Sequence, residues 1–148
     1  MTIGNKHRVY LGLGSNLGDR KHNISQAIRL ICERVGTVLR CSTMIETEPW
    51  GFESSNRFVN AVVLCLTELS PRQTLVATQQ IERDLGRTEK SPPKALEDKC
   101  PAYKDRPIDI DILLYDNLTV DEPDLKIPHP LMNERDFVMT PLKQIYIN

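Results

Sequence analysis

The chain has 148 residues, of which 40% are hydrophobic and 26% charged, and its formal net charge is −1. This composition is that of an ordinary globular protein, and the length predicts a single domain over residues 1–148 that can bury a core. The near-neutral charge argues against a nucleic-acid binder, which usually carries a clear positive excess. No apolar run is long enough to span a membrane, and residues 1–8 lack the apolar core of a signal peptide, so we expect a cytoplasmic protein.

The chain holds four cysteines, and none of them stands in a CxxC spacing: Cys32, Cys41, Cys65 and Cys100. Three of them lie in apolar patterns. We therefore expect reduced, buried thiols rather than disulfides or a zinc site.

The first third of the chain predicts a strand, a helix and a second strand. Residues 9–13 form a short apolar run typical of a buried strand, and the glycine-containing residues 14–18 are expected to end it. Asp19 can cap a helix whose apolar residues recur at helical spacing until Gly36. Residues 37–47 are rich in β-branched and alternating residues and predict the second strand.

The middle of the chain carries the strongest strand signal, at residues 58–69. Alternate residues from Phe58 onward should line one face of this strand, and those from Val59 onward the other. Ser70 followed by Pro71 predicts the start of a helix, which Gly86 should end.

The last third begins with a long polar loop, residues 87–107, of the kind that is usually functional or disordered. Residues 108–115 predict a fourth strand, 118–120 a possible short one, and 133–145 a final helical stretch in which Pro141 could cause a break. The order β-α-β-β-α-β is that of an α+β ferredoxin-like fold, with two helices packed on one face of an antiparallel sheet and a C-terminal helical tail.

Two aspartates share one face of the fourth predicted strand. Asp109 and Asp111 are two residues apart, so their carboxylates lie about 7 Å apart on the same side, while Ile108, Ile110 and Ile112 point to the other side. Such a pair can hold one or two Mg²⁺ ions, which bind oxygen ligands and keep water or phosphate in the rest of their shell. The alternative is a solvated edge strand with its polar residues outward.

Arginines flank the acidic pair in the sequence. Arg87 follows the helix stop at Gly86, and Arg106 precedes the strand by two residues. Guanidinium groups can neutralise charge on a transferring phosphoryl group, although each arginine could equally be a solvated surface residue.

Glycines, aromatic residues and a histidine are further candidates. The GxGxxxG spacing from Gly12 is one residue too long for a dinucleotide fingerprint and favours a plain turn. Phe58 and Asn60 share a strand face and, with Phe137, suit a flat heterocycle, although core packing is the alternative for each ring. His129 stands between two prolines and could be structural or functional.

In combination, these motifs resemble the 6-hydroxymethyl-7,8-dihydropterin pyrophosphokinase family over almost the whole chain. They are YLGLGSNLG at residues 10–18, ETEPWG at 46–51, FVNA at 58–61, IER at 81–83, GR at 86–87, RPIDID at 106–111, IPHP at 127–130 and PL at 141–142. No one of these motifs suffices, but their ordered combination is specific.

The resemblance implies a substrate pair, a cofactor and a role for each matching residue. ATP and the pterin would be the substrates, with two Mg²⁺ ions held by Asp109 and Asp111 and no obligate protein partner. The implied catalytic residues are Arg87, Arg106, Asp109 and Asp111. The implied ATP contacts are Gln79, Glu82, Arg87, Arg106, Ile112, His129 and Arg135. The implied pterin contacts are Thr47, Glu48, Pro49, Trp50, Phe58, Asn60, Tyr103 and Phe137.

Two other classes of protein with this fold remain as alternatives. An RNA-recognition domain would need exposed aromatic residues on its two central strands, for which Tyr10 and Phe58 are candidates, and a basic face. A small phosphohydrolase would release phosphate from an acyl phosphate without any pterin.

Overall fold

The computed structural model describes residues 6–47, 57–86 and 107–147. Five strands form one antiparallel sheet: β1 (His7–Ser15), β2 (Gly36–Cys41), β3 (Ile45–Thr47), β4 (Phe58–Thr67) and β5 (Asp109–Tyr115). The order across the sheet is β2-β4-β1-β5, and β3 also pairs with β4. This order is the one expected of a ferredoxin-like fold, and the prediction of the fold class is confirmed.

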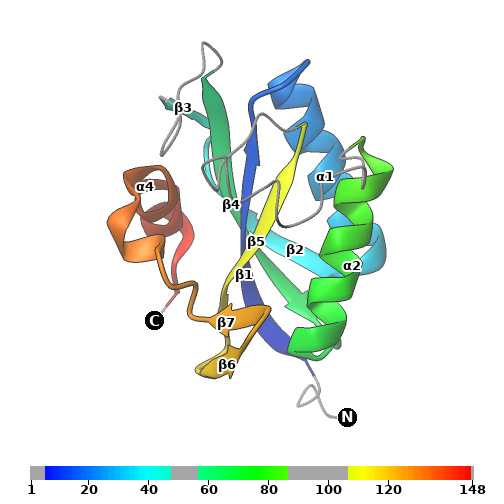
Figure 1. Cartoon of the computed structure of the whole chain (residues 1–148), viewed down its shortest axis with the longest axis vertical. Coiled ribbons are helices and arrows are strands. Elements are labelled where there is room, and N and C mark those ends of the chain that lie inside the picture. The colour runs from blue at the N-terminus through cyan, green and yellow to red at the C-terminus, as the bar shows by residue number, and fades with distance from the viewer. Residues whose placement is uncertain (1–5, 48–56, 87–106, 148) are drawn as a thin grey trace.

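Helices cover both faces of the sheet. Helices α1 (Arg20–Arg34) and α2 (Pro71–Asp84) lie on one face, and α4 (Asp136–Ile145) lies on the other (Figure 1). Alternate residues of β1 and β4 explain this arrangement, because the strands are apolar on both sides. Val9, Leu11 and the Val59 side of β4 pack toward α1 and α2, whereas Tyr10 and Val62 pack toward α4.

Both long helices begin where the sequence predicts. The Asp19 side chain accepts a hydrogen bond from the backbone N–H of His22 at 3.2 Å. Ser70 and Gln73 form a reciprocal capping box at the start of α2, with Pro71 in the first turn. Gly86 follows α2 with a φ of 108°, a conformation that favours glycine.

The second predicted strand is in fact two strands. Residues 42–44 separate β2 from β3, because side chains there replace part of the backbone ladder. Ser42 Oγ accepts the N–H of Val62 at 2.9 Å, and Gln144 Oε1 of α4 accepts the N–H of Thr43 at 2.8 Å. The strand predicted at residues 9–13 also differs, since β1 continues to Ser15 on its register with β4.

The C-terminal part departs further from the prediction. A hairpin of β6 (Val120–Glu122) and β7 (Leu125–Ile127) replaces the single short strand expected near residue 119. A 3-10 turn at Met132–Glu134 precedes α4, which continues through Pro141 rather than breaking there.

The expectation of buried cysteines is correct only for Cys65. Cys32 and Cys41 are exposed, and all three are free thiols. Cys100 lies outside the described residues. None of the described helices is long and apolar enough to cross a membrane.

Candidate active site

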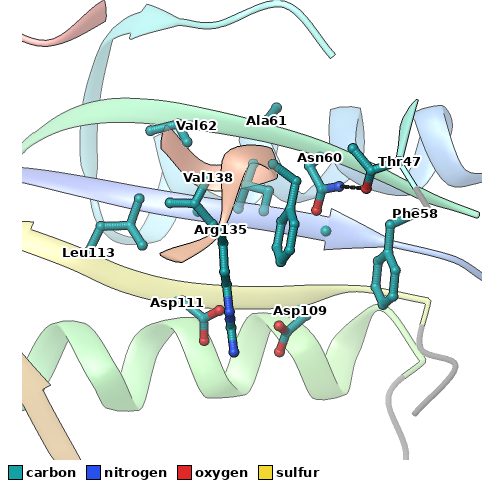
Figure 2. Close-up of a pocket in the computed structure, with 14 residues that line it drawn as sticks. Thr47, Phe58, Asn60, Ala61, Val62, Asp109, Asp111, Leu113, Arg135 and Val138 are labelled. Atoms are coloured by element: carbon teal, nitrogen blue, oxygen red, sulfur yellow. Dashed lines mark hydrogen bonds between the residues drawn. The ribbon is translucent and has the colours of Figure 1, made fainter. Parts of the chain in front are cut away.

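A pocket opens where β1, β4 and β5 face the start of α4. Its empty volume is about 530 Å³, including space open to solvent. Its lining, much of which Figure 2 labels, comprises Gly12, Leu13, Gly14, Thr47, Phe58, Asn60, Ala61, Val62, Asp109, Asp111, Leu113, Arg135, Phe137 and Val138. The pocket therefore brings together residues from both ends of the chain.

The floor of this pocket is formed by β1, which has glycine at two alternate positions. Gly12 and Gly14 pair with Asp111 and Asp109 on one side and with Val62 and Asn60 on the other. A Cβ atom on Gly14 would lie 3.0 Å from Asn60 Oδ1 and 3.6 Å from Phe58 Cδ1. The absence of a side chain at Gly14 therefore leaves room for the amide and the ring.

One wall of the pocket is an amide held in a fixed orientation. Asn60 is only 5% exposed, and its Nδ2 donates a hydrogen bond to Thr47 Oγ1 at 2.9 Å (Figure 2). Thr47 is held in place by β3, whose register with β4 sets Thr47 opposite Phe58. An amide, a hydroxyl and an aromatic ring in one half-buried wall can bind the edge and face of a flat polar heterocycle.

The opposite wall carries the two aspartates, whose side chains lie on the same face of β5. Ile108, Ile110 and Ile112 pack in the core on the other face, as the alternation predicts. Both carboxylates are half-buried in the pocket lining. No cluster of three or more His, Cys, Asp or Glu ligands occurs among the described residues. Two oxygen ligands without soft donors fit Mg²⁺, which takes its remaining ligands from water and phosphate.

A buried cation faces this acidic pair. Arg135 is 4% exposed, and Figure 2 shows its side chain pointing toward Asp109 and Asp111. Burial lowers the pKa of its guanidinium group, which nevertheless remains charged at neutral pH. Its Cζ lies 5.6 Å from the centre of the Phe137 ring. The start of α4 thus supplies a positive charge and an aromatic face to the same site.

A second pocket, with an empty volume of about 640 Å³, lies on the other side of Asp111. Its lining comprises Leu75, Ile110, Asp111, Ile112, Pro123, Asp124, Leu125, Lys126, His129 and Pro130. Asp111 lines both pockets, whereas Asp109 lines only the first, so the aromatic cavity and the more polar one share a single carboxylate.

His129 is held in this second pocket by backbone contacts. Its N–H donates to the Leu113 carbonyl at 3.0 Å, and its Nδ1 accepts from the Leu131 N–H at 3.3 Å. Burial lowers the pKa of His129, an effect that the negative charge of Asp109 opposes. The ring is therefore a neutral group near pH 7.

The remaining predicted residues are not all gathered here. Gln79 is exposed on α2 and lines neither pocket. Glu82 is buried, and its Oε2 accepts the backbone N–H of Ile110 at 2.6 Å. Six predicted site residues lie outside the described residues: Glu48, Pro49, Trp50, Arg87, Tyr103 and Arg106.

Several lining residues were not predicted. The roles of Gly12 and Gly14 in the pocket floor could have been inferred, because their period of two sets them opposite the buried Leu11 and Leu13. Lys126 lies on the hairpin of β6 and β7, which was not predicted from the sequence. No sequence pattern therefore indicated that Lys126 lines the second pocket.

An acidic pair in an aromatic cavity, with one carboxylate shared with a polar cavity, is an arrangement that suits a transferase holding two substrates around a metal ion. Comparison with known families identifies that transferase class more closely. The chain belongs to the 7,8-dihydro-6-hydroxymethylpterin-pyrophosphokinase (HPPK) family, whose model matches residues 10–147.

Individual relatives agree with this assignment. The chain is 51% identical over 138 residues to the 2-amino-4-hydroxy-6-hydroxymethyldihydropteridine pyrophosphokinase of Porphyromonas gingivalis, covering 93% of this chain and 89% of the relative. It is 39% identical over 140 residues to the Aquifex aeolicus protein of the same name, covering 95% and 81%.

Solved structures support the fold. A Plasmodium falciparum HPPK-DHPS wild-type structure with pteroate superposes with a TM-score of 0.69 at 16% identity, covering 93% of this chain and 38% of that chain. A second HPPK-DHPS structure, in complex with substrates, gives 0.68 over 95% of this chain and 40% of that chain. This chain therefore spans less than half the length of the solved chains it matches.

Proposed function

We propose that this protein transfers the pyrophosphoryl group of ATP to the hydroxymethyl group of 6-hydroxymethyl-7,8-dihydropterin, a step of folate synthesis, with Mg²⁺ as cofactor. The observation that carries the proposal is the acidic pair in the aromatic cavity, with Asp111 also lining the polar cavity, in a chain that matches the family over residues 10–147. The RNA-recognition alternative loses support, because Tyr10 is 4% exposed and packs with the residues of α4.

The pterin is proposed to bind in the aromatic cavity. Asn60 and Thr47 would form hydrogen bonds with its edge, and Phe58 and Phe137 would pack against its faces. The apolar lining near Leu113 excludes water from the ring, so each hydrogen bond at its edge is formed in a medium of low dielectric.

ATP is proposed to bind in the polar cavity, with its phosphates directed toward the acidic pair. Mg²⁺ bound by Asp109 and Asp111 would neutralise part of the triphosphate charge. Arg135 would add a fixed positive charge, and neutral His129, whose Nδ1 accepts the Leu131 N–H, can donate a hydrogen bond from Nε2. From the family resemblance, we also assign Arg87 and Arg106 to the transferring group.

The proposed reaction is an in-line displacement. The pterin hydroxyl oxygen attacks the β-phosphorus, the bond from that phosphorus to the oxygen bridging to the α-phosphorus breaks, and AMP leaves with the bridging oxygen. The hydroxyl proton would pass to solvent, since the two carboxylates in the lining of the aromatic cavity, Asp109 and Asp111, would be occupied by the metal ion. The chain's main contribution is to orient the two substrates, which can lower a barrier by about 7–11 kcal/mol in favourable cases.

The test is the nucleotide product formed from ATP, Mg²⁺ and the pterin. We expect AMP to appear in step with the pterin diphosphate, and we expect no product from Asp109→Asn protein that retains its fold. ADP would contradict pyrophosphoryl transfer, and full activity of Asp109→Asn would contradict the metal assignment.

A further inference from the structure

The Glu82 carboxylate is buried beside the strand that carries the two aspartates. Glu82 is 6% exposed and belongs to the buried side of α2, together with Thr78 and Ile81. Its Oε2 accepts the N–H of Ile110 at 2.6 Å, and Ile110 stands between Asp109 and Asp111. At 2.6 Å this hydrogen bond lies at the short end of the range for N–H donors and oxygen acceptors.

The bonded N–H group belongs to an open edge of the sheet. Among the described strands, β5 pairs only with β1. Successive residues of an antiparallel edge strand alternate between facing the neighbouring strand and facing away from it. The Ile110 N–H is directed to Glu82 and therefore away from β1. By this alternation, the backbone N–H and C=O groups of Asp109 and Asp111 face β1. Glu82 and β1 therefore hold this segment of β5 from both sides.

We infer that Glu82 is a positioning residue that fixes the direction of the Asp109 and Asp111 carboxylates through the Ile110 amide. This inference rests on the proposed function. What the position requires is an acceptor oxygen that reaches Ile110, rather than a negative charge near the nucleotide. This role differs from the nucleotide contact that the family resemblance implies for Glu82, and the two roles predict different effects of substitution.

Three substitutions separate the need for an acceptor oxygen that extends to the Ile110 amide from the need for a negative charge. Glu82→Gln keeps an acceptor oxygen at the same distance along the side chain and removes the charge. Glu82→Asp keeps the charge and withdraws the oxygens by one methylene group. Glu82→Leu removes both. Thr78→Val is the matched control, because Thr78 is buried on the same helix but donates its hydroxyl to the Leu75 carbonyl and not to β5.

The first readout needs no turnover. Hydrogen exchange of the Ile110 amide, followed by NMR in the full chain, should be unchanged in Glu82→Gln and Thr78→Val. It should be at least about tenfold faster in Glu82→Asp and Glu82→Leu, because the edge amide loses its acceptor. Unchanged Ile110 exchange in both of these variants would overturn the inference.

The second readout is metal binding. The Mn²⁺ concentration for half-saturation, measured by electron paramagnetic resonance with a non-hydrolysable ATP analogue, should rise about 10- to 100-fold in Glu82→Asp and Glu82→Leu. It should stay within about threefold in Glu82→Gln. Similar weakening of ATP-analogue binding in Glu82→Gln and Glu82→Leu at saturating Mn²⁺, the two variants that lose the charge, would instead indicate a charged nucleotide contact and overturn the inference.

The two proposals fail in different ways. If the unaltered protein makes no AMP, the proposed function fails, while Ile110 exchange and Mn²⁺ binding still test the position of the acidic pair. If Glu82→Leu does not fold, the contrast between Glu82→Gln and Glu82→Asp carries the test. Selective loss of AMP formation in Glu82→Gln, with Glu82→Asp still active, would also overturn the inference.

Discussion

A methyl group added to the pocket floor should weaken pterin binding. In Gly14→Ala the new Cβ would lie 3.0 Å from Asn60 Oδ1, a separation that carbon and amide oxygen atoms rarely adopt. The amide is confined, because Asn60 is 5% exposed and bonded to Thr47. Either the Asn60 amide must therefore shift by a few tenths of an ångström, or the pterin that it is proposed to bind must shift instead.

The expected size follows from the hydrogen bonds involved. Losing the geometry of one hydrogen bond costs about 0.5–1.5 kcal/mol, which corresponds to a rise of roughly 2- to 13-fold in the pterin dissociation constant. Loss of a second bond, or direct contact between the methyl group and the pterin ring, would increase the effect. Isothermal titration calorimetry with the pterin and a non-hydrolysable ATP analogue measures the pterin dissociation constant directly.

Gly12→Ala is the matched control for this experiment. Gly12 lies on the same strand and lines the same pocket, but the three atoms nearest to its Cβ would all belong to the Leu113 side chain, the closest at 3.4 Å. That contact is ordinary and involves a flexible group, so pterin affinity should change less than in Gly14→Ala. Equal affinities of the unaltered protein and Gly14→Ala would refute the assignment of Asn60 to the pterin edge.

Three further predictions follow from other contacts. Arg20 of α1 pairs at 2.7 Å with Glu46 of β3, the strand that carries Thr47, and Arg20→Met should raise the pterin dissociation constant by about 2- to 5-fold in the same titration, since an exposed pair contributes up to about 1 kcal/mol. Burial raises the pKa of Cys65 to about 12, so mass spectrometry after treatment with iodoacetamide at pH 8 should find this thiol unmodified until the protein unfolds. Burial lowers the pKa of His129 below 6.5, so the unfolded chain binds more protons there, and the free energy of unfolding should fall as the pH drops below 6.5; denaturant titrations should show a smaller fall in His129→Gln.

The sheet and its first two helices could be predicted because their signals are local. Asp19 and Ser70 cap helices with their own side chains, and the alternation in β4 follows from the period of a strand. The shared face of Asp109 and Asp111 follows from the same period. Patterns of this kind depend only on neighbours in the chain.

The departures arise from contacts between distant segments. The interruption after β2 depends on Gln144, 101 residues from Thr43 in the sequence. The burial of Glu82 depends on an amide of β5, which no helical pattern reveals. Arg135 was assigned by resemblance alone, and Phe137 was a candidate only as an aromatic residue, because nothing in their local sequence indicates that α4 would cover the face of the sheet that holds the aspartates.

The position of α4 explains why a common fold can present a site for two substrates. In this chain α1 and α2 cover one face of the sheet, and the opposite face carries the acidic pair and the two glycines of β1. Helix α4 covers only part of that opposite face, through Val138 and the residues after it. The first turn of α4 lies at the pocket, where Arg135 and the Phe137 ring can contact a ligand. Substitutions in the last turn of α4 should therefore affect stability, whereas those in its first turn should affect binding.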